Sequence, residues 1–113
     1  MTTEEIGAQF KALGDVTRLR ILALLSLREY CNCELVAIFG ISQPAISRHM
    51  ARLKEARLIQ EKRQGQWIFY SLTRDPFRPG QGLGETLARI READPVVTQA
   101  ASESPNCTVP APS

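Results

Sequence analysis

Three cysteines are the residues of this 113-residue chain whose chemistry is most distinctive. Cys31 and Cys33 are separated by one residue, and Cys107 lies near the C-terminal end of the sequence. An odd number of cysteines argues against a disulfide framework, and thiolates are the ligands that soft ions prefer. A structural zinc site normally has four ligands. The sequence offers these three thiols and the imidazole of its one histidine, His49. The spacing therefore favours a thiophilic ion or thiol redox chemistry.

A basic segment, residues 42–66, is the second distinctive feature. It contains six Lys or Arg residues against two Glu, which gives a net charge of +4. Gln43, Ser47 and Arg48 fall near the amino end of a predicted helix, from which side chains reach base edges in a DNA major groove. The helix N-terminus and the basic side chains favour phosphate, although a solvated charged helix face is the alternative interpretation. The predicted DNA-binding residues are Ser42, Gln43, Pro44, Ser47, Arg48, His49, Arg52, Arg63, Gln64 and Gln66.

The sequence lacks the residue patterns of common enzyme sites. It contains no glycine-rich nucleotide-binding loop and no set of Ser, His and Asp, since its one histidine lies in the basic segment. A thiol-dependent enzyme would need a glycine-rich anion-binding loop next to its nucleophile, and nothing around Cys31 supplies one. We therefore expect that the protein is not an enzyme and has neither an organic cofactor nor a small-molecule substrate.

Apolar periodicity predicts a mostly helical chain. Residues 4–13 repeat apolar side chains at helical spacing, and residues 16–27 are apolar on nearly every side, which is typical of a buried central helix. Ser42 followed by Pro44 indicates a helix start, because serine caps helices and proline is tolerated in the first turn. The expected helices span residues 4–13, 16–27, 33–39, 43–57 and 83–92.

Between the fourth and the last expected helix, the pattern changes to short β-rich runs. Residues 58–63 and 66–72 are predicted to form a hairpin, with Gln64-Gly65 supplying the tight turn. The basic and amide side chains at its tip suit an anionic partner. This order of elements is that of a winged helix-turn-helix, a mainly α (α+β) fold with about five helices and one β-hairpin wing.

The length allows one small domain, which excludes a multidomain enzyme. Residues 1–92 form the predicted winged helix-turn-helix domain, and residues 93–113 form a flexible tail rich in Pro, Ala and Ser that carries Cys107. The whole chain has a net charge of +2, but residues 1–91 hold all 14 Lys and Arg residues against nine acidic ones. The predicted domain is therefore basic, as a nucleic-acid partner requires.

No run approaches the about 18 consecutive apolar residues of a membrane span. The N-terminal Met-Thr-Thr-Glu-Glu also lacks the basic and then apolar layout of a signal peptide. We therefore expect a cytoplasmic protein without a membrane partner, in a compartment that keeps cysteines reduced.

Three stretches carry motifs with specific spacing. They are Leu-Gly-Asp-Val-Thr-Arg-Leu-Arg-Ile-Leu at residues 13–22, Ser-Gln-Pro-Ala-Ile-Ser-Arg-His-Met at residues 42–50, and Arg-Gln-Gly-Gln-Trp at residues 63–67, followed by Tyr70. Together they resemble the ArsR/SmtB family of arsenical-resistance repressors over about residues 5–75. The resemblance implies a homodimer, with the first and last helices at its interface, that binds double-stranded operator DNA of two-fold symmetry. It also implies release from the DNA when a metal or metalloid binds.

The pair Cys31 and Cys33 is similar to the Cys-x-Cys motif of the As(III)- and Sb(III)-responsive members of that family. The third cysteine of the best-known version would fall at Val36, whose side chain cannot ligate. Cys107 is the predicted replacement, because a flexible link of 14 residues from Ala93 spans about 20 Å. The predicted ligands of As(III) or Sb(III) are therefore Cys31, Cys33 and Cys107. The last expected helix contains no His, so the resemblance does not extend to members that sense zinc there.

Two other sensing chemistries stay open on the same fold. One is a thiol-redox sensor, and the other is a sensor of another soft metal such as Cd, Pb or Zn. Cys31 and Cys33 could also be packing residues and Cys107 a bystander, whereas a metal-carrying chaperone would leave the basic segment unexplained. If Cys31 and Cys33 are both helical, their side chains point about 200° apart. Binding one ion with both should then distort the start of their helix and move the adjacent DNA-reading helix.

Overall fold

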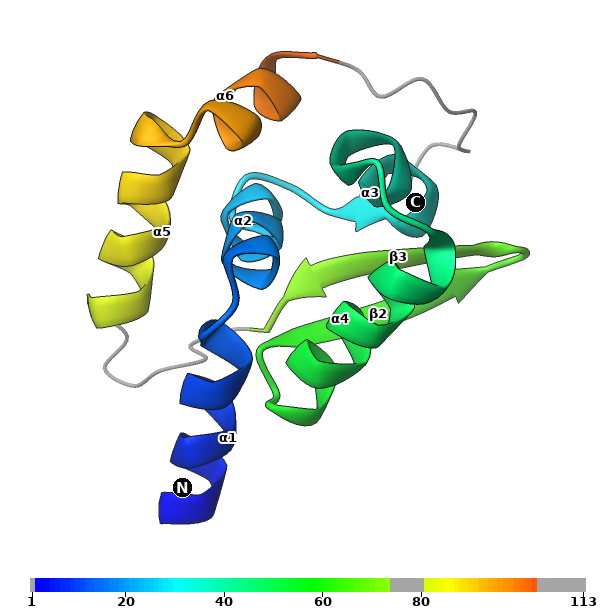
Figure 1. Cartoon of the computed structure of the whole chain (residues 1–113). Helices are drawn as coiled ribbons and strands as arrows, with labels where there is room; N and C mark the ends of the chain where they lie inside the picture. Colours follow the sequence, from blue (N-terminus) through cyan, green and yellow to red (C-terminus); the bar gives the residue numbers. More distant parts are fainter. Residues whose placement is uncertain (1, 74–80, 104–113) are drawn as a thin grey trace.

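The computed structural model of the chain describes residues 2–73 and 81–103. Within these residues, six helices and one three-stranded antiparallel sheet form the predicted winged helix-turn-helix (Figure 1). None of these helices is long and apolar enough to span a bilayer. In chain order the elements are α1 (Thr3–Leu13), α2 (Val16–Leu25), β1 (Tyr30–Cys31), α3 (Asn32–Phe39), α4 (Gln43–Glu55), β2 (Ile59–Gln64), β3 (Trp67–Leu72), α5 (Gln81–Ala93) and α6 (Pro95–Ser102).

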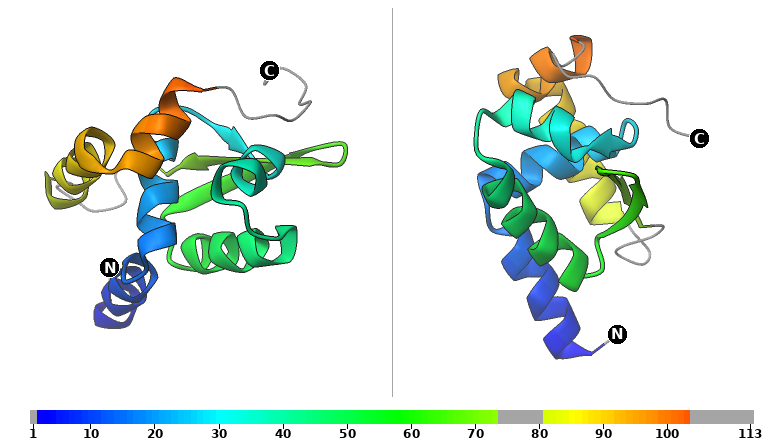
Figure 2. Two further views of the ribbon diagram at one scale, coloured as in Figure 1. Left: turned by 45° about the horizontal axis from the view of Figure 1, so that its top comes forward. Right: turned by 90° about the vertical axis from the view of Figure 1, so that its right-hand side faces the viewer.

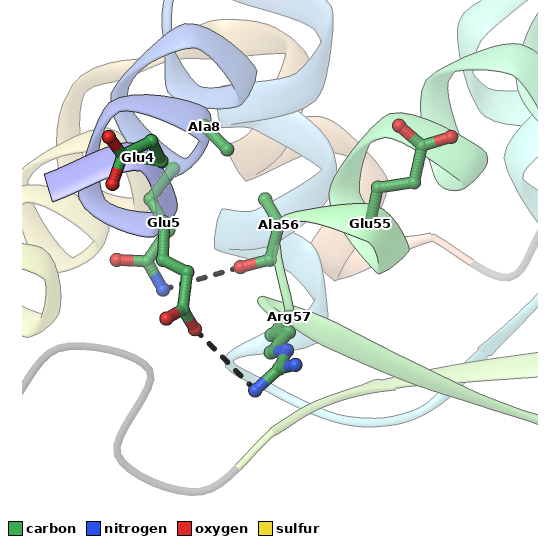
Figure 3. A pocket seen from close by; sticks show the side chains of 7 residues that line it. Glu4, Glu5, Ala8, Glu55, Ala56 and Arg57 are labelled. Atoms are coloured by element: carbon green, nitrogen blue, oxygen red, sulfur yellow. Dashed lines mark hydrogen bonds and ion pairs between the residues drawn. The ribbon is translucent and has the colours of Figure 1, made fainter. Parts of the chain in front are cut away.

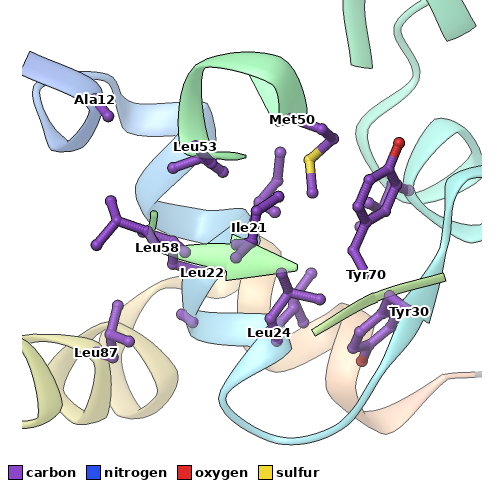
Figure 4. Close-up of a cluster of buried hydrophobic side chains, with 14 of the residues drawn as sticks. Ala12, Ile21, Leu22, Leu24, Tyr30, Met50, Leu53, Leu58, Tyr70 and Leu87 are labelled. Atoms are coloured by element: carbon purple, nitrogen blue, oxygen red, sulfur yellow. The ribbon is translucent and has the colours of Figure 1, made fainter. Parts of the chain in front are cut away.

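Helix α2 lies at the centre of the fold. Its last five residues are buried, and the helix contacts α1, α4, α5, α6 and β3. Figure 4 shows Ile21, Leu22 and Leu24 among apolar side chains from α1, α4, α5 and the sheet. The sequence predicted this burial, because a helix that is apolar all round must be surrounded by other elements.

Cap residues fix where the central helices begin and end. Asp15 caps α2, where its Oδ1 accepts a hydrogen bond from the backbone N–H of Arg18 at 2.9 Å. Ser42 caps α4, where its Oγ accepts a hydrogen bond from the backbone N–H of Ala45 at 3.3 Å. Gly40 ends α3 with a φ of 65°, a left-handed conformation that glycine adopts without strain. The short turn between Gly40 and Ser42 thus sets α4 at an angle to α3, as a helix-turn-helix requires.

The sheet joins the wing to a short strand that precedes α3. Strands β2 and β3 form the predicted hairpin, which turns at Gly65 with a φ of 63°. Strand β1 pairs antiparallel with β3, with Cys31 opposite Phe69, so the strand order is β1-β3-β2. No strand was predicted at β1, because two residues are too few to show the alternation of a strand.

The prediction that a flexible tail begins at residue 93 is wrong for its first part. The structure contains α6 there, and its Val97 and Ala100 are buried where the helix packs on α2 and α5 (Figure 2). Asp94 caps this helix by accepting hydrogen bonds from two backbone N–H groups at 2.9 and 3.2 Å, and it forms a 3.0 Å ion pair with Arg20. Aspartate followed by proline was the overlooked signal of a helix start. Cys107 lies outside the described residues.

We expect Asp94→Ala to lower the free energy of unfolding by about 1–2 kcal/mol. The substitution removes both the cap of α6 and the ion pair with Arg20. Asp94→Asn should lose less, because asparagine still caps a helix. Urea unfolding at pH 7 measures both variants, and an Asp94→Ala protein as stable as the wild type would contradict this role.

The same pair predicts a pH dependence. Burial alone would raise the pKa of Asp94, but the hydrogen bonds from Arg20 and from backbone N–H groups hold that pKa below its ordinary value. A carboxylate with a lowered pKa stabilises the fold above the pKa of the unfolded chain, and its contribution is lost as the pH falls through the lowered value. The stability gap between wild type and Asp94→Asn should therefore close in acid.

Candidate nucleic-acid interface and thiol site

Helix α4 presents a polar face to solvent. Ile46, Met50 and Leu53 are buried and fix the helix against the core. The opposite side of α4 is exposed, and it carries six predicted DNA-binding residues within or just before its first three turns. They are Ser42, Gln43, Pro44, Ser47, Arg48 and Arg52. The predicted division of this helix into an apolar stripe and exposed polar flanks is therefore confirmed.

The hairpin of β2 and β3 lies beside α4 and extends this exposed surface (Figures 1 and 2). Lys54 on α4 forms an ion pair with Glu61 on β2, with 2.6 Å between Nζ and Oε1. Arg63 and Gln66 at the end of the hairpin are exposed. Gln64 is half-buried, and its Oε1 is buried without a hydrogen-bond partner among the described residues. Of the predicted wing residues, Gln64 is therefore the one that the fold presents least to solvent.

His49 contacts α2 rather than standing on the exposed face of α4. Its Nδ1 lies 3.3 Å from Nη1 of Arg18 and 4.0 Å from Oδ1 of Asp15. Burial lowers the pKa of His49. The negative charge of Asp15 raises this pKa, and the positive charges of Arg18 and Arg48 lower it further, so the net shift is downward. The imidazole is therefore neutral at pH 7. His49 was predicted to bind DNA, but its contacts favour a role in holding α4 against α2.

The Cys-x-Cys pair lies where β1 ends and α3 begins. Cys31 is the last residue of β1 and the cap residue of α3, in an extended conformation, and Cys33 belongs to the first turn of the helix. The backbone N–H of Cys31 donates to Oε1 of Glu34 at 2.9 Å, and Oε2 of Glu34 accepts from Arg28 at 2.9 Å. Cys31 is therefore not helical, so the condition of two helical cysteines considered from the sequence is not met.

The thiol of Cys31 is buried and linked to the wing. Its Sγ donates to Oδ1 of Asn32 at 3.0 Å, and the same oxygen accepts from the backbone N–H of Ile68 in β3 at 3.3 Å. Burial raises the pKa of Cys31, so this side chain is a protonated thiol at neutral pH. Redox sensors rely on a thiolate of low pKa, and the surroundings of Cys31 do not favour one. Sequence reasoning missed Asn32, although a polar residue between two cysteines was a visible signal.

The structure describes two of the three predicted ligands. Cys33 is half-buried on α3, and Cys107 lies outside the described residues. In the described part of the chain, no group of three or more His, Cys, Asp or Glu side chains is arranged to hold a metal ion. Because His49 is engaged with α2, sulfur is the donor that this site offers to an ion. That donor type fits a thiophilic ion. Cys31 offers a free thiol, whereas Cys33 is disulfide-bonded in this structure and offers its sulfur only when reduced.

A separate pocket of about 250 Å³ lies between α1 and the end of α4 (Figure 3). Nε2 of Gln9 donates to the backbone carbonyl of Ala56 at 3.3 Å, and Glu5 forms a 3.6 Å ion pair with Arg57. These contacts fasten α1 to the corner between α4 and β2. None of the predicted site residues lines this pocket.

Comparison with known sequences places the matched region over α2 to β2. Residues 15–61 match the family described as "Bacterial regulatory protein, arsR family". The arsenic resistance transcriptional regulator ArsR1 of Pseudomonas putida is 47% identical over 64 residues, which cover 56% of this chain and 50% of the relative. The arsenical resistance operon repressor of Staphylococcus xylosus is 37% identical over 75 residues, which cover 66% of this chain and 72% of the relative. The chain thus spans about half the length of some curated relatives and nearly three quarters of others.

Solved structures share the fold. HlyU of Vibrio cholerae, in its reduced form, matches with a TM-score of 0.65 and 24% sequence identity, over 82% of this chain and 92% of that one. At this identity the likeness concerns the arrangement of helices and strands.

We expect Cys31 to react slowly with iodoacetamide in the folded protein, because its thiol is buried and protonated. Labelling at pH 7 should be at least about tenfold slower than in the urea-unfolded chain. Timed labelling followed by fragment mass spectrometry distinguishes Cys31 from Cys33 on their shared peptide, with Cys31→Ser as the control. Equal labelling rates for Cys31 in the folded and unfolded chain would contradict the buried position.

Proposed function

This chain belongs to the arsR family of bacterial regulatory proteins, and we propose that it is a cytoplasmic repressor of transcription that binds operator DNA as a homodimer. As(III) or Sb(III), bound by cysteine thiols, releases it from the DNA. The observation that carries this proposal is a juxtaposition. Cys31 lies in a strand that pairs with the wing, and the wing lies beside the exposed polar face of α4. The names of the P. putida and S. xylosus relatives support an arsenic-type effector.

The exposed face of α4 is the proposed DNA-reading surface. Gln43, Ser47 and Arg48 lie in the first two turns of α4, where a helix inserted into a major groove contacts base edges. Arg63 on the wing lies beyond this helix and is suited to a phosphate. The positive end of the α4 dipole adds to the attraction for the DNA backbone.

The homodimer is supported by apolar side chains that the single chain leaves in water. Phe10 and Ile6 on α1 are 64% and 40% exposed, and Val16 at the start of α2 is 61% exposed. Covering such residues with a second copy removes apolar surface from water, which favours association. A two-fold dimer would present two α4 helices to two successive major grooves.

Cys107 is the proposed third ligand beside Cys31 and Cys33. Because α6 ends at Ser102, only four residues, 103–106, lie between this helix and Cys107. The five Cα-to-Cα steps from Ser102 to Cys107 reach at most about 17 Å. This link is shorter than the 14 residues expected from the sequence, so the tail thiol is held closer to the folded domain and meets the other thiols at a higher effective concentration.

The position of Cys31 explains how an occupied thiol site could alter DNA binding. β1 is paired with β3 of the wing, and α3 packs against α4. A rearrangement of the residues around Cys31 therefore reaches both parts of the DNA-binding surface. Since effector and DNA act on one equilibrium, each must weaken the affinity for the other by the same factor.

A sensor of another soft metal, such as Cd, Pb or Zn, is the alternative on the same surface. It uses the same thiols, and the choice among soft ions depends on how many ligands the tail adds. A thiol-redox sensor is less favoured, because the pKa of Cys31 is raised.

The test is a fluorescence-anisotropy titration of the reduced protein on DNA from its own upstream promoter, followed by arsenite. We expect arsenite to release the wild type and to leave the double variant Cys31→Ser/Cys33→Ser on the DNA. The double variant should bind the DNA as the wild type does. Cys107→Ser should bind the DNA and need more arsenite for release.

Each other outcome removes a defined part of the proposal. Absence of DNA binding by the wild type would refute the repressor. Binding that arsenite and antimonite leave unchanged would refute the metalloid effector, and release by Cd, Pb or Zn would then identify the alternative. An unchanged arsenite affinity in Cys107→Ser would remove the tail cysteine from the ligands.

We expect Arg48→Ala to weaken promoter binding by about 1–3 kcal/mol through a lost base or phosphate contact. Arg63→Ala should weaken binding and also make the dependence of affinity on salt shallower by about one ion. Arg89→Ala is the control, because Arg89 is exposed on α5 and carries the same charge. Anisotropy at four salt concentrations measures the three variants, and wild-type affinity in both Arg48→Ala and Arg63→Ala would exclude this surface.

A further inference from the structure

Glu61 is a carboxylate set into the basic surface of α4 and the wing. Its Oε1 lies 2.6 Å from Nζ of Lys54 on α4, and its Oε2 lies 4.0 Å from Nε of Arg63 on its own strand. The Glu61 side chain is 20% exposed, whereas those of Lys54 and Arg63 are 58% and 73% exposed. The partly buried carboxylate of Glu61 thus forms an ion pair with the exposed Lys54 and lies close to the exposed Arg63.

The surroundings of Glu61 form a groove between α4 and the hairpin. Its volume is about 290 Å³, and its lining includes Ser47, Ala51, Lys54, Glu61 and Arg63. Ser47 and Arg63, on opposite sides of the groove, are both predicted DNA-binding residues. Glu61 lines the same groove as these two residues and therefore lies close to their proposed DNA contacts.

We propose that Glu61 limits the affinity of this protein for DNA by competing with phosphate for Lys54. This inference rests on the proposed DNA-binding function. In the free protein, the carboxylate neutralises Lys54, so the lysine displaces no counterion from an approaching DNA strand. For Lys54 to reach a phosphate, its bond to Glu61 must first be broken, and the uncovered carboxylate then repels the same phosphate.

A moderate affinity for DNA has a function in a repressor that must be released. A bound effector lowers the affinity for DNA by a fixed factor. A repressor that binds its DNA more tightly therefore stays bound at an effector concentration that releases a repressor of lower DNA affinity. By this reasoning Glu61 sets the arsenite concentration at which the protein leaves its operator.

The first test compares Glu61→Gln with Glu55→Gln by anisotropy on promoter DNA. Both substitutions remove one negative charge, and Glu55 is exposed on α4 and lines the same groove without being the partner of Lys54. We expect Glu61→Gln to bind about three- to tenfold more tightly at 0.1 M salt, with a salt dependence steeper by about one ion. Glu55→Gln should change affinity by less than about twofold.

A double-mutant cycle shows whether Lys54 is the residue that is released. Lys54→Ala should weaken binding in the wild-type background, because it uncovers the Glu61 carboxylate, and should abolish most of the gain in the Glu61→Gln background. Equal affinity gains in Glu61→Gln and Glu55→Gln would reduce the effect to overall charge and overturn the inference. Weaker DNA binding by Glu61→Gln, with an unchanged thermal unfolding midpoint, would also overturn the inference. It would indicate instead that the ion pair of Glu61 with Lys54 positions the wing for DNA binding.

The outcomes for the inference and for the proposed function are separable. If the wild type does not bind the promoter fragment, the repressor itself is refuted. If the wild type binds and Glu61→Gln binds no more tightly, the repressor stands and the competition does not. The arsenite concentration for half-release should rise in Glu61→Gln together with its DNA affinity, and an unchanged value would contradict the link to release.

Discussion

Burial of α2 is the constraint on which the rest of the structure depends. Its C-terminal half has no exposed side, so α1, α4, α5, α6 and β3 must all pack around it. Polar residues of its N-terminal half then set the angles of its neighbours, because Arg18 reaches His49 on α4 and Arg20 pairs with Asp94 before α6. Such buried apolar surface supplies most of the driving force for folding, and the polar contacts select one arrangement. The polar face of α4 is directed outward because its apolar face is held by α2.

The short strand β1 brings the thiol site into the same framework. Arg28 lies 3.7 Å above the ring centre of Tyr30 and also pairs with Glu34, so the segment between α2 and α3 is held by a cation–π contact and an ion pair. Cys31 follows directly and shares its Asn32 contact with β3. Two paired residues therefore link the cysteines to the wing, while α3 links them to α4.

The parts that the sequence predicted are those with a local signal. The apolar run of α2, the cap at Ser42 and the glycine at the hairpin turn each depend on residues close in the chain, and each was confirmed. The rest depends on partners far away in the sequence. β1 exists because β3 lies beside it. The ion pair between Lys54 and Glu61 joins α4 to β2, and the apolar periodicity of the sequence does not show that these two elements lie side by side. At α6 a local signal was present in Asp94, but a composition rich in Ala and Pro outweighed it.

The burial of Cys31 bears directly on how the proposed sensor would act. Its side chain has no exposed surface, and its sulfur donates a hydrogen bond to the oxygen that Ile68 also contacts. The thiol of Cys31 cannot donate that hydrogen bond once its sulfur is bonded to an ion. The hydrogen bond to Asn32 and the bond to an ion therefore exclude each other. Part of the binding free energy must then be used to open the contact between α3 and the wing. A ligand that favours one of two exclusive arrangements shifts the equilibrium by its differential affinity. In the proposed sensor, burial would thus lower the affinity of the thiol site for its effector, and the same burial would transmit binding to the proposed DNA surface.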